Sequence, residues 1–347
     1  MKAARGIRSQ ESGRKAAEVG GPGAISGEAL LDIYGKMVLT RTLDERVWQL
    51  NRQGRAALVA SSQGHEAVQV GSVAVMRPGS DLFYTYYRDL GVMISVGMSP
   101  YQIMLGYMAR AGEPMSGARQ FPTQGAMPGL GLVNLSNVVA THLPQGVGAS
   151  LAMRMQGRDA VVAIYFGDGA SSTGDCHEAM NFASVHRLPV VFICENNGYA
   201  ISVPVSKQMA VDSVASRAAG YGIPGATLDG TDAVAVYEAT AAAVDRARSG
   251  DGPTLIEAKV ERFRPHTGDD DDRRYRSAKE LEAALARDPL AALRSQLFAS
   301  GRLSESQDEQ ISESARRQVD EATDLAEAAP LPDPSTFAEH VYAERLA

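Results

Sequence analysis

The chain alternates short apolar runs with helix-like segments between residues 160 and 263, and this alternation restricts the fold more than any other feature. AVVAIYF (160–166) and VVFIC (190–194) are typical of buried strands, and IPGATLDG (223–230) and PTLIEAKVERF (253–263) are predicted to be a third and a fourth strand. Helices are expected over 176–186 and 233–248, between the strands. Strands that alternate with helices at this spacing form right-handed crossovers and a parallel sheet, whose near-continuous apolar strands are covered on both faces.

Helical spacing of apolar residues continues on both sides of this section. It begins at residue 26, continues over 64–76 and twice within 89–108, and returns over 278–298 and 304–328. Residues 114–131 are rich in glycine and have no period, which is typical of a functional or mobile loop. We therefore predict an α/β fold in a single domain over 26–347. It has a parallel sheet with helices on both faces and helical N- and C-terminal extensions, after a disordered tail over 1–25.

Composition excludes several classes of protein. With 44% hydrophobic and 22% charged residues, the chain of 347 residues reads as an ordinary soluble protein. The net charge of −7 gives no basic surface for nucleic acid, and no apolar run approaches the roughly 20 residues of a membrane span. Two cysteines, Cys176 and Cys194, do not make a disulfide framework and fit a reducing compartment. Residues 1–24 lack the apolar centre of a secretory signal, so we expect a cytoplasmic protein with no nucleic-acid or membrane partner.

Two polar turns follow neighbouring strands. Asp168, in GDG, follows the first strand, and Asn197, in NNGY, follows the second strand 29 positions later. In a parallel sheet such turns lie side by side at the carboxyl edge, where ligands bind in open α/β folds. Mg²⁺ on a diphosphate needs hard oxygen ligands, which Asp168, the Asn197 amide and the main-chain oxygen of Tyr199 would supply. The backbone at Gly169 and Ala170 would approach the phosphates at a helix start.

GDG followed by NN at this interval resembles the thiamine-diphosphate motif. The longer segment GDGASSTGDCHEAMNFASVHRLPVVFICENNGYAIS (167–202) resembles the alpha subunits of 2-oxo acid dehydrogenases, and the resemblance extends from about residue 30 to the C-terminus. GDG alone is a weak signal, because any tight strand–helix turn can contain it. ENNGYAIS at the right distance makes the motif specific. The resemblance implies a thiamine-diphosphate-binding fold with thiamine diphosphate and Mg²⁺ as cofactors.

The resemblance also implies roles for residues outside the two turns. Tyr87 and Arg88, in FYTYYRDLG, would contact the diphosphate. Arg262 and His266, in ERFRPHTGDDDDRRYRS, would lie in a loop that closes over the cofactor, and His266 would be the catalytic residue that helps acyl transfer to a lipoyl group. Without the resemblance, Arg88 reads as a surface ion pair and His266 as a solvated loop residue.

The segment at 136–142 resembles the one that lies against the aminopyrimidine, with Asn137 and Val139 as contacts. Ser136 and Thr141 would supply oxygens for a structural potassium ion. Asn137, Val138 and His142 depart from the family pattern there, so the potassium site stays open. Two further departures are Glu195, where some relatives carry an arginine, and Gln124, where many carry an active-site histidine.

The activity that the resemblance implies is oxidative decarboxylation of a 2-oxo acid and acyl transfer to a lipoyl-bearing acyltransferase. Because we find no glutamate here for cofactor activation, the chain would act only with a beta subunit, in a heterotetramer of two alpha and two beta chains. ARQFP (118–122), SSQGHEAVQVG (61–71) and PHTGDDDDRRYR (265–276) resemble the branched-chain 2-oxo acid enzymes most.

Three alternatives remain. The chain could serve a pyruvate or acetoin dehydrogenase instead. It could be a scaffold subunit that lost its activity, as the departures at 124, 137–138 and 195 allow, although a chain freed from catalysis has no reason to keep the whole residue set together. It could also be a nucleotide-binding α/β protein, but neither MPGLGLVNL nor GDGASSTG makes a G-x-G-x-x-G fingerprint with an acidic ribose ligand after it.

Overall fold

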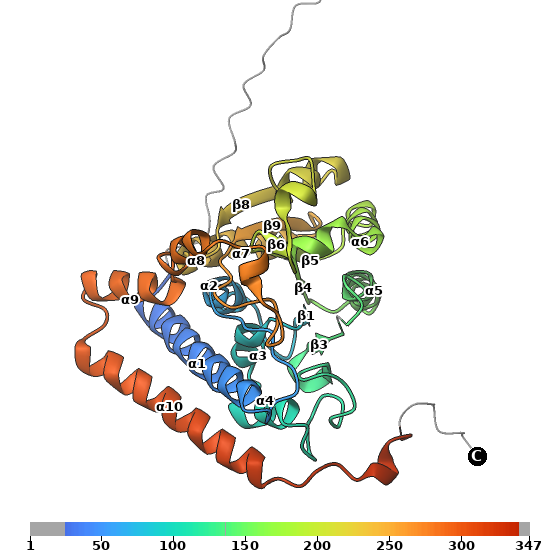
Figure 1. Ribbon diagram of the computed structural model, residues 1–347. Coiled ribbons are helices and arrows are strands. Elements are labelled where there is room, and N and C mark those ends of the chain that lie inside the picture. The colour runs from blue at the N-terminus through green and yellow to red at the C-terminus, as the bar shows by residue number, and fades with distance from the viewer. Residues whose placement is uncertain (1–24, 136, 340–347) are drawn as a thin grey trace, which may run out of the picture.

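A seven-stranded sheet forms the centre of the part of the chain that the computed structural model describes, residues 25–135 and 137–339 (Figure 1). The strands lie in the order β2-β3-β1-β4-β5-β9-β8. Their bounds are β1 Leu82–Thr85, β2 Gly125–Met127, β3 Leu132–Asn134, β4 Val162–Gly167, β5 Val190–Asn196, β8 Gly225–Asp229 and β9 Thr254–Lys259. A separate hairpin joins β6 (Tyr199–Ala200) to β7 (Val203–Pro204).

Adjacent strands of the sheet pair in parallel except β2 and β3, which are antiparallel. The predicted parallel sheet is thus confirmed, with one antiparallel strand at its edge. The prediction missed β1, β2 and β3. Strands of three or four residues are too short to display a period of two, and β2 lies in the glycine-rich stretch that was predicted to be a loop.

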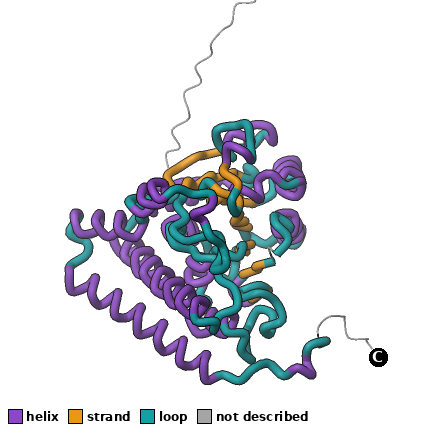
Figure 2. Tube along the Cα trace, viewed as in Figure 1, coloured by secondary structure: helices purple, strands orange, loops and turns teal. Residues whose placement is uncertain are grey.

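The two faces of the sheet enter different hydrophobic cores, because successive side chains of a strand point to opposite faces. On β4, Ala163 and Tyr165 pack into one core with the helices over 66–73, 90–96 and 233–248, whereas Val162 and Ile164 pack into the other with the helices over 142–155 and 174–185. The apolar runs of β4 and β5, residues 162–166 and 190–194, therefore contact a core on each face, as the sequence indicates. Figure 2 shows the strands at the centre with helices on either side.

The predicted helical extensions are present at both ends of the described chain. The bounds of the helices are α1 Gly27–Arg52, α2 Glu66–Val73, α3 Leu90–Val96, α4 Pro100–Tyr107, α5 His142–Met155, α6 Gly174–Val185, α7 Ala233–Arg248, α8 Ala278–Leu285, α9 Pro289–Ala299 and α10 Glu305–Ala328. In Figure 1 the long helices α1 and α10 lie outside the layer formed by α2 and α3. None of the described helices has the length and apolarity to cross a membrane.

One predicted helix is wrong in its extent. The helix expected over 278–298 is two helices, α8 and α9, because Pro289 cannot continue α8 and Asp288 instead caps the start of α9 by accepting a hydrogen bond from the Leu290 amide. The tail predicted over 1–25 lies outside the described residues except for Ile25, and so do residues 340–347 of the predicted domain.

Candidate active site

A cavity of about 470 Å³ lies where β1, β4 and β5 end. Because these strands are parallel, the residues that follow them meet at one edge of the sheet. Most of the predicted site residues line this cavity: Tyr87, Arg88, Asn137, Val139, Asp168, Gly169, Ala170, Asn197, Tyr199 and His266. Arg262 and Thr141 do not line it, and Ser136 lies outside the described residues. The structure thus brings together turns that lie far apart in the sequence.

Asp168 is the buried carboxylate of the site. It follows β4 directly, its side chain is 1% exposed, and its Oδ2 accepts a 2.6 Å hydrogen bond from Nε2 of Gln208. Burial raises the pKa of Asp168, while hydrogen bonds from Gln208 and from the main chain of Asn197 act in the opposite direction. The turns after β4 and β5 are therefore in direct contact at this carboxylate.

Asn197 is held in one orientation by its own turn. Its Oδ1 accepts a 3.2 Å hydrogen bond from the Tyr199 amide, an Asx turn that Gly198 permits with φ of 85°. Its Nδ2 lies 3.5 Å from Nε2 of His65. The main chain that the turn carries forward to Tyr199 forms the strand β6 on the wall of the cavity.

Gly169 is the point of closest approach between the two turns. A Cβ at this position would lie 2.7 Å from Cβ of Ala200, closer than two such atoms pack. Glycine therefore lets the β6–β7 hairpin rest on the turn after β4. Gly174, which starts α6 five residues later, differs from Gly169, because a Cβ added there would meet no atom within 4 Å.

Arg88 and Arg262 place two buried positive charges beside the cavity. Each side chain is 1% exposed, and neither forms an ion pair within the described residues. Arg88 donates to the main-chain oxygen of His266, and Arg262 donates to that of Ile201 and to the Tyr275 hydroxyl. Burial and the charge of Arg88 lower the pKa of Arg262. Buried guanidinium groups without a counter-ion favour an anion, and phosphate matches their geometry.

His266 lies over the same site. Its Nδ1 is 3.4 Å from the Arg88 guanidinium, and its ring meets Tyr87 edge-on with centroids 5.7 Å apart. Its amide donates a 2.9 Å hydrogen bond to Asp270. Burial, Arg88 and Arg262 lower the pKa of His266 to about 3. The imidazole is therefore neutral near pH 7, with one N–H donor and one acceptor nitrogen.

In the described part of the segment predicted to hold potassium, residues 137–142, the predicted hydroxyl ligand is already in a hydrogen bond. The hydroxyl of Thr141 donates a 2.8 Å hydrogen bond to the main-chain oxygen of Val138. His142 is buried and donates from Nε2 to the main-chain oxygen of Tyr165 at 2.7 Å, which leaves Nδ1 as a buried acceptor with no partner among the described residues. Burial lowers the pKa of His142 to about 4. A neutral ring nitrogen is a poor ligand for a hard cation such as potassium.

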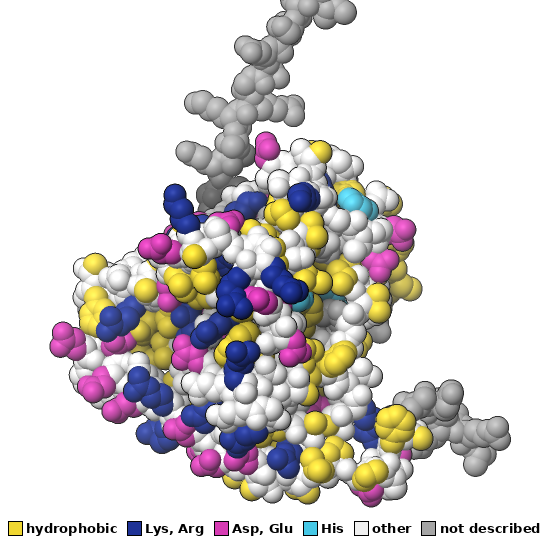
Figure 3. Space-filling model, viewed as in Figure 1, with side chains coloured by type: hydrophobic (Ala, Val, Ile, Leu, Met, Phe, Trp, Pro, Cys, Tyr) yellow, Lys and Arg dark blue, Asp and Glu magenta, His cyan; other side chains and the backbone are white. Residues whose placement is uncertain are grey.

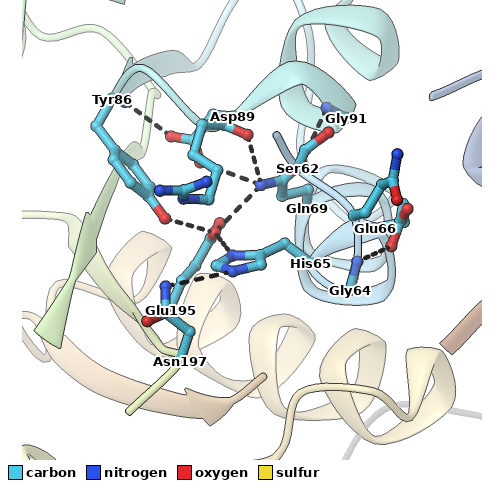
Figure 4. Close-up of polar contacts among 12 residues, drawn as sticks. Ser62, Gly64, His65, Glu66, Gln69, Tyr86, Asp89, Gly91, Glu195 and Asn197 are labelled. Carbon is cyan, nitrogen blue, oxygen red and sulfur yellow. Dashed lines mark hydrogen bonds and ion pairs between the residues drawn. The ribbon is translucent and has the colours of Figure 1, made fainter. Parts of the chain in front are cut away.

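A second polar cluster lies behind the site, and sequence reasoning missed it (Figure 4). Glu195 points away from the cavity, is fully buried, and accepts hydrogen bonds from His65, Gln69 and the hydroxyl of Tyr86 at 2.6, 3.1 and 2.9 Å. Burial and the nearby Glu195 raise the pKa of Asp89. No local signal marks this cluster, because His65 and Glu195 are 130 residues apart in the sequence.

The donor set indicates which metal the cavity suits. Among residues 25–135 and 137–339, no group of three or more His, Cys, Asp or Glu side chains is placed to hold a metal ion. One carboxylate, one amide and main-chain oxygens instead suit Mg²⁺, which usually shares its ligands with the phosphates of a bound molecule.

Comparison with known proteins agrees with this geometry. The profile of the family described as "Dehydrogenase E1 component" matches residues 34–335. The chain belongs to this family. Family membership implies dependence on thiamine diphosphate and a 2-oxo acid dehydrogenase activity, and alpha subunits of the family act with a beta subunit in a multienzyme complex.

Three relatives from different organisms extend the similarity over nearly the whole E1 chain. The 2-oxoisovalerate dehydrogenase subunit alpha of Bacillus subtilis (strain 168) is 43% identical over 92% of this chain and 97% of its own length. The 3-methyl-2-oxobutanoate dehydrogenase subunit alpha of Mycobacterium tuberculosis (strain ATCC 25618 / H37Rv) is 40% identical over 91% of this chain and 83% of its own length. The mitochondrial 2-oxoisovalerate dehydrogenase subunit alpha of Homo sapiens is 36% identical over 91% of this chain and 71% of its own length.

Proposed function

We propose that this chain is the alpha subunit of the decarboxylating component of a branched-chain 2-oxo acid dehydrogenase, and that it holds the Mg²⁺ and diphosphate of thiamine diphosphate. Asp168, the Asn197 amide and the main-chain oxygen of Tyr199 would be the metal ligands. The observation that carries the proposal is the meeting of Asp168 and Asn197 at one cavity beside two buried guanidinium groups that have no carboxylate partner among the described residues.

The residues fit the cofactor in charge and in shape. The diphosphate would supply the anion that Arg88 and Arg262 favour, and the lack of a side chain at Gly169 would let the backbone lie close to it. Tyr87 and Ala170 would line the same phosphates, and Asn137 and Val139 would lie against the aminopyrimidine. When bound, the cofactor supplies the thiazolium carbon that attacks the 2-oxo carbonyl and takes up the electrons left by CO₂.

The chain's own residues orient the reactants and handle a proton. Neutral His266, held beside Tyr87 and Arg88, would donate a hydrogen bond from its ring N–H to the lipoyl sulfur that leaves as the disulfide opens during acyl transfer. The apolar wall of the cavity, which includes Leu58, Tyr107 and Ile201, would exclude water from the reacting centre.

The composition of the cavity supports the need for a beta subunit. Asp168 is the only carboxyl among the described residues that line it, and as a metal ligand it would not be free to activate the cofactor ring. Apolar side chains on the cavity wall are exposed, with Phe121, Val139 and Ile201 at 58%, 54% and 56%. Hydrophobic side chains also gather along the middle of the face in Figure 3. Exposed apolar surface of this kind favours a protein partner. We propose an α2β2 heterotetramer that passes acyl groups to the lipoyl domain of an acyltransferase.

The substrate follows from the relatives and from the cavity wall. The similar proteins are named for 2-oxoisovalerate or 3-methyl-2-oxobutanoate, and an apolar wall suits a branched aliphatic chain. Pyruvate and acetoin enzymes and a scaffold role are not favoured. Potassium stays a prediction, which the nitrogen of His142 and the bonded hydroxyl of Thr141 disfavour. Cytoplasmic location also stays a prediction.

The test is an activity assay of the chain co-expressed with its beta subunit, with thiamine diphosphate and Mg²⁺. It follows the reduction of an artificial electron acceptor, because acetoin has no carboxyl group and releases no CO₂. Initial rates are compared for 3-methyl-2-oxobutanoate, pyruvate and acetoin. We expect the branched substrate to have the highest kcat/KM and the alpha chain alone to have no turnover. A strong preference for pyruvate would refute the substrate, and turnover by the alpha chain alone would refute the shared site.

A further inference from the structure

His65 lies between the candidate metal ligand and a buried carboxylate, as Figure 4 shows. It is fully buried and directly precedes α2. One ring nitrogen, Nδ1, lies 2.6 Å from Oε2 of Glu195. The other, Nε2, lies 3.5 Å from Nδ2 of Asn197. The imidazole thus bridges the cluster behind the site and the edge of the cavity.

The hydrogen bonds around Asn197 determine which nitrogen of His65 carries the proton. Because the Tyr199 amide donates to Oδ1 of Asn197, the amide nitrogen Nδ2 must face His65. An amide nitrogen only donates, so Nε2 of His65 must accept. The proton then sits on Nδ1 and points at Glu195, whose carboxylate accepts it.

Glu195 is itself fixed in place. Its Oε2 also accepts from the Gln69 side chain at 3.1 Å and from the Tyr86 hydroxyl at 2.9 Å. These donors come from α2 and from the residue after β1, so two elements hold the carboxylate that orients the imidazole. A flipped Asn197 amide would lose its bond from Tyr199 and would place its oxygen against an acceptor nitrogen.

We propose that His65 is a positioning residue for the metal: Glu195 fixes its tautomer, and its Nε2 keeps the oxygen of Asn197 on the side of Tyr199, ready to bind the cation. This inference rests on the proposed function, because it needs Asn197 to be a metal ligand. Outer-shell partners of this kind typically change metal affinity about 10–100-fold when they are replaced.

Two nearly isosteric substitutions separate the two ring nitrogens. The end of a glutamine side chain takes the place of Nε2, and the end of an asparagine side chain takes the place of Nδ1. His65→Gln therefore keeps an acceptor for Asn197, whereas His65→Asn keeps only a partner for Glu195. In the assembled enzyme with its beta subunit, we measure by calorimetry the Mg²⁺ concentration that gives half-maximal binding of thiamine diphosphate. We expect His65→Asn to raise it about 10–100-fold and His65→Gln to stay nearer to the wild type.

A double variant shows whether His65 acts through Asn197. Asn197→Asp keeps an oxygen ligand but has no donor for Nε2. Adding His65→Asn to this variant should therefore lower the affinity for Mg²⁺ little further. Two results would overturn the inference. One is that the losses of Mg²⁺ affinity from His65→Asn and Asn197→Asp add in the double variant. The other is that His65→Asn and His65→Gln lose the same Mg²⁺ affinity. If the wild-type enzyme binds no cofactor with Mg²⁺, the proposed function fails; if it binds and both His65 variants match it, only this inference fails. Should His65→Asn not assemble, Glu195→Gln replaces it, with weaker Mg²⁺ binding again expected.

Discussion

Oδ2 of Asp168 accepts a 2.6 Å hydrogen bond from Nε2 of Gln208, which lies 40 residues further along the chain. The same Nε2 donates to the main-chain oxygen of Val203 in the β6–β7 hairpin. One amide group thus joins the turn after β4 to the hairpin that follows β5. The carboxylate reaches the cavity in an orientation that its neighbours set.

Replacing Gln208 should therefore weaken metal binding. Gln208→Leu removes the bond to Asp168, and we expect the apparent affinity for Mg²⁺ in the presence of thiamine diphosphate to fall about tenfold. Calorimetry on the assembled enzyme measures it. Ser206→Ala, at an exposed position two residues earlier, is the control and should behave as the wild type. An unchanged affinity in Gln208→Leu would show that the bond does not orient the ligand.

Arg262 should contribute to anion binding although it does not line the cavity. Arg262→Met removes one of two buried charges, and a hydrogen bond to a charged group contributes about 1.5–3 kcal/mol, so we expect thiamine diphosphate to bind about 10–100-fold more weakly. Inorganic diphosphate with Mg²⁺ should raise the melting temperature of the wild type. It should raise the melting temperature of Arg262→Met much less. Arg273→Met is the control in the same loop, since the Arg273 side chain is 86% exposed. Equal stabilisation of both variants would contradict the role.

Gly169 should not tolerate a side chain. In Gly169→Ala the added Cβ would meet Ala200 at 2.7 Å, so the β6–β7 hairpin must move and carry Tyr199 with it. We expect weaker cofactor binding with a melting temperature close to that of the wild type. Gly174→Ala, whose Cβ meets no atom within 4 Å, should leave binding unchanged. If both variants bind alike, the close packing of the two turns does not matter for the site.

His142 should make the protein less stable in mild acid. Its pKa is about 4 in the folded chain and about 6.5 when unfolded, so the unfolded chain binds the extra proton between these values. The contribution of neutral His142 to the free energy of unfolding is fully present above pH 6.5. It is lost as the pH falls toward 4, at up to about 1.4 kcal/mol per pH unit.

The matched variant is His142→Gln, whose Nε2 can still donate to the Tyr165 oxygen. Its free energy of unfolding, from denaturant titrations between pH 7 and pH 5, should fall less steeply than that of the wild type. Asn181→Gln, at an exposed position on α6, replaces no titratable group and should leave the slope unchanged. Parallel curves for wild type and His142→Gln would contradict the buried neutral imidazole.

The parts of the fold that sequence predicts are those whose pattern is local. Strands β4 and β5 contain apolar runs of five residues, β9 has a shorter apolar stretch, and α7 has the bounds predicted for it. The short strands β2 and β3 are stabilised by pairing with each other and by the pairing of β3 with β1, which no short stretch of sequence reveals. The break between α8 and α9 was readable in Asp288 and Pro289, because a proline after a capping residue starts a helix.

The site residues likewise include some that local sequence predicts and some that it does not. Asp168 and Asn197 follow directly from strand ends and their spacing, whereas Arg88, Arg262 and His266 came from the family resemblance. His65, Gln69 and Gln208 could not be assigned from sequence, because their partners Glu195 and Asp168 are distant along the chain and their side chains read as ordinary polar residues. Glu195, read as a departure from some relatives, instead anchors a hydrogen-bonded cluster behind the cavity.

The most direct test of the account is a Mg²⁺ titration of thiamine diphosphate binding to the assembled enzyme with Asp168→Ala, beside Glu178→Gln at an exposed position on α6. The account predicts that Asp168→Ala assembles with the beta subunit but loses Mg²⁺-dependent binding of the cofactor, while Glu178→Gln binds as the wild type does. Wild-type affinity for Mg²⁺ and thiamine diphosphate in Asp168→Ala would contradict it.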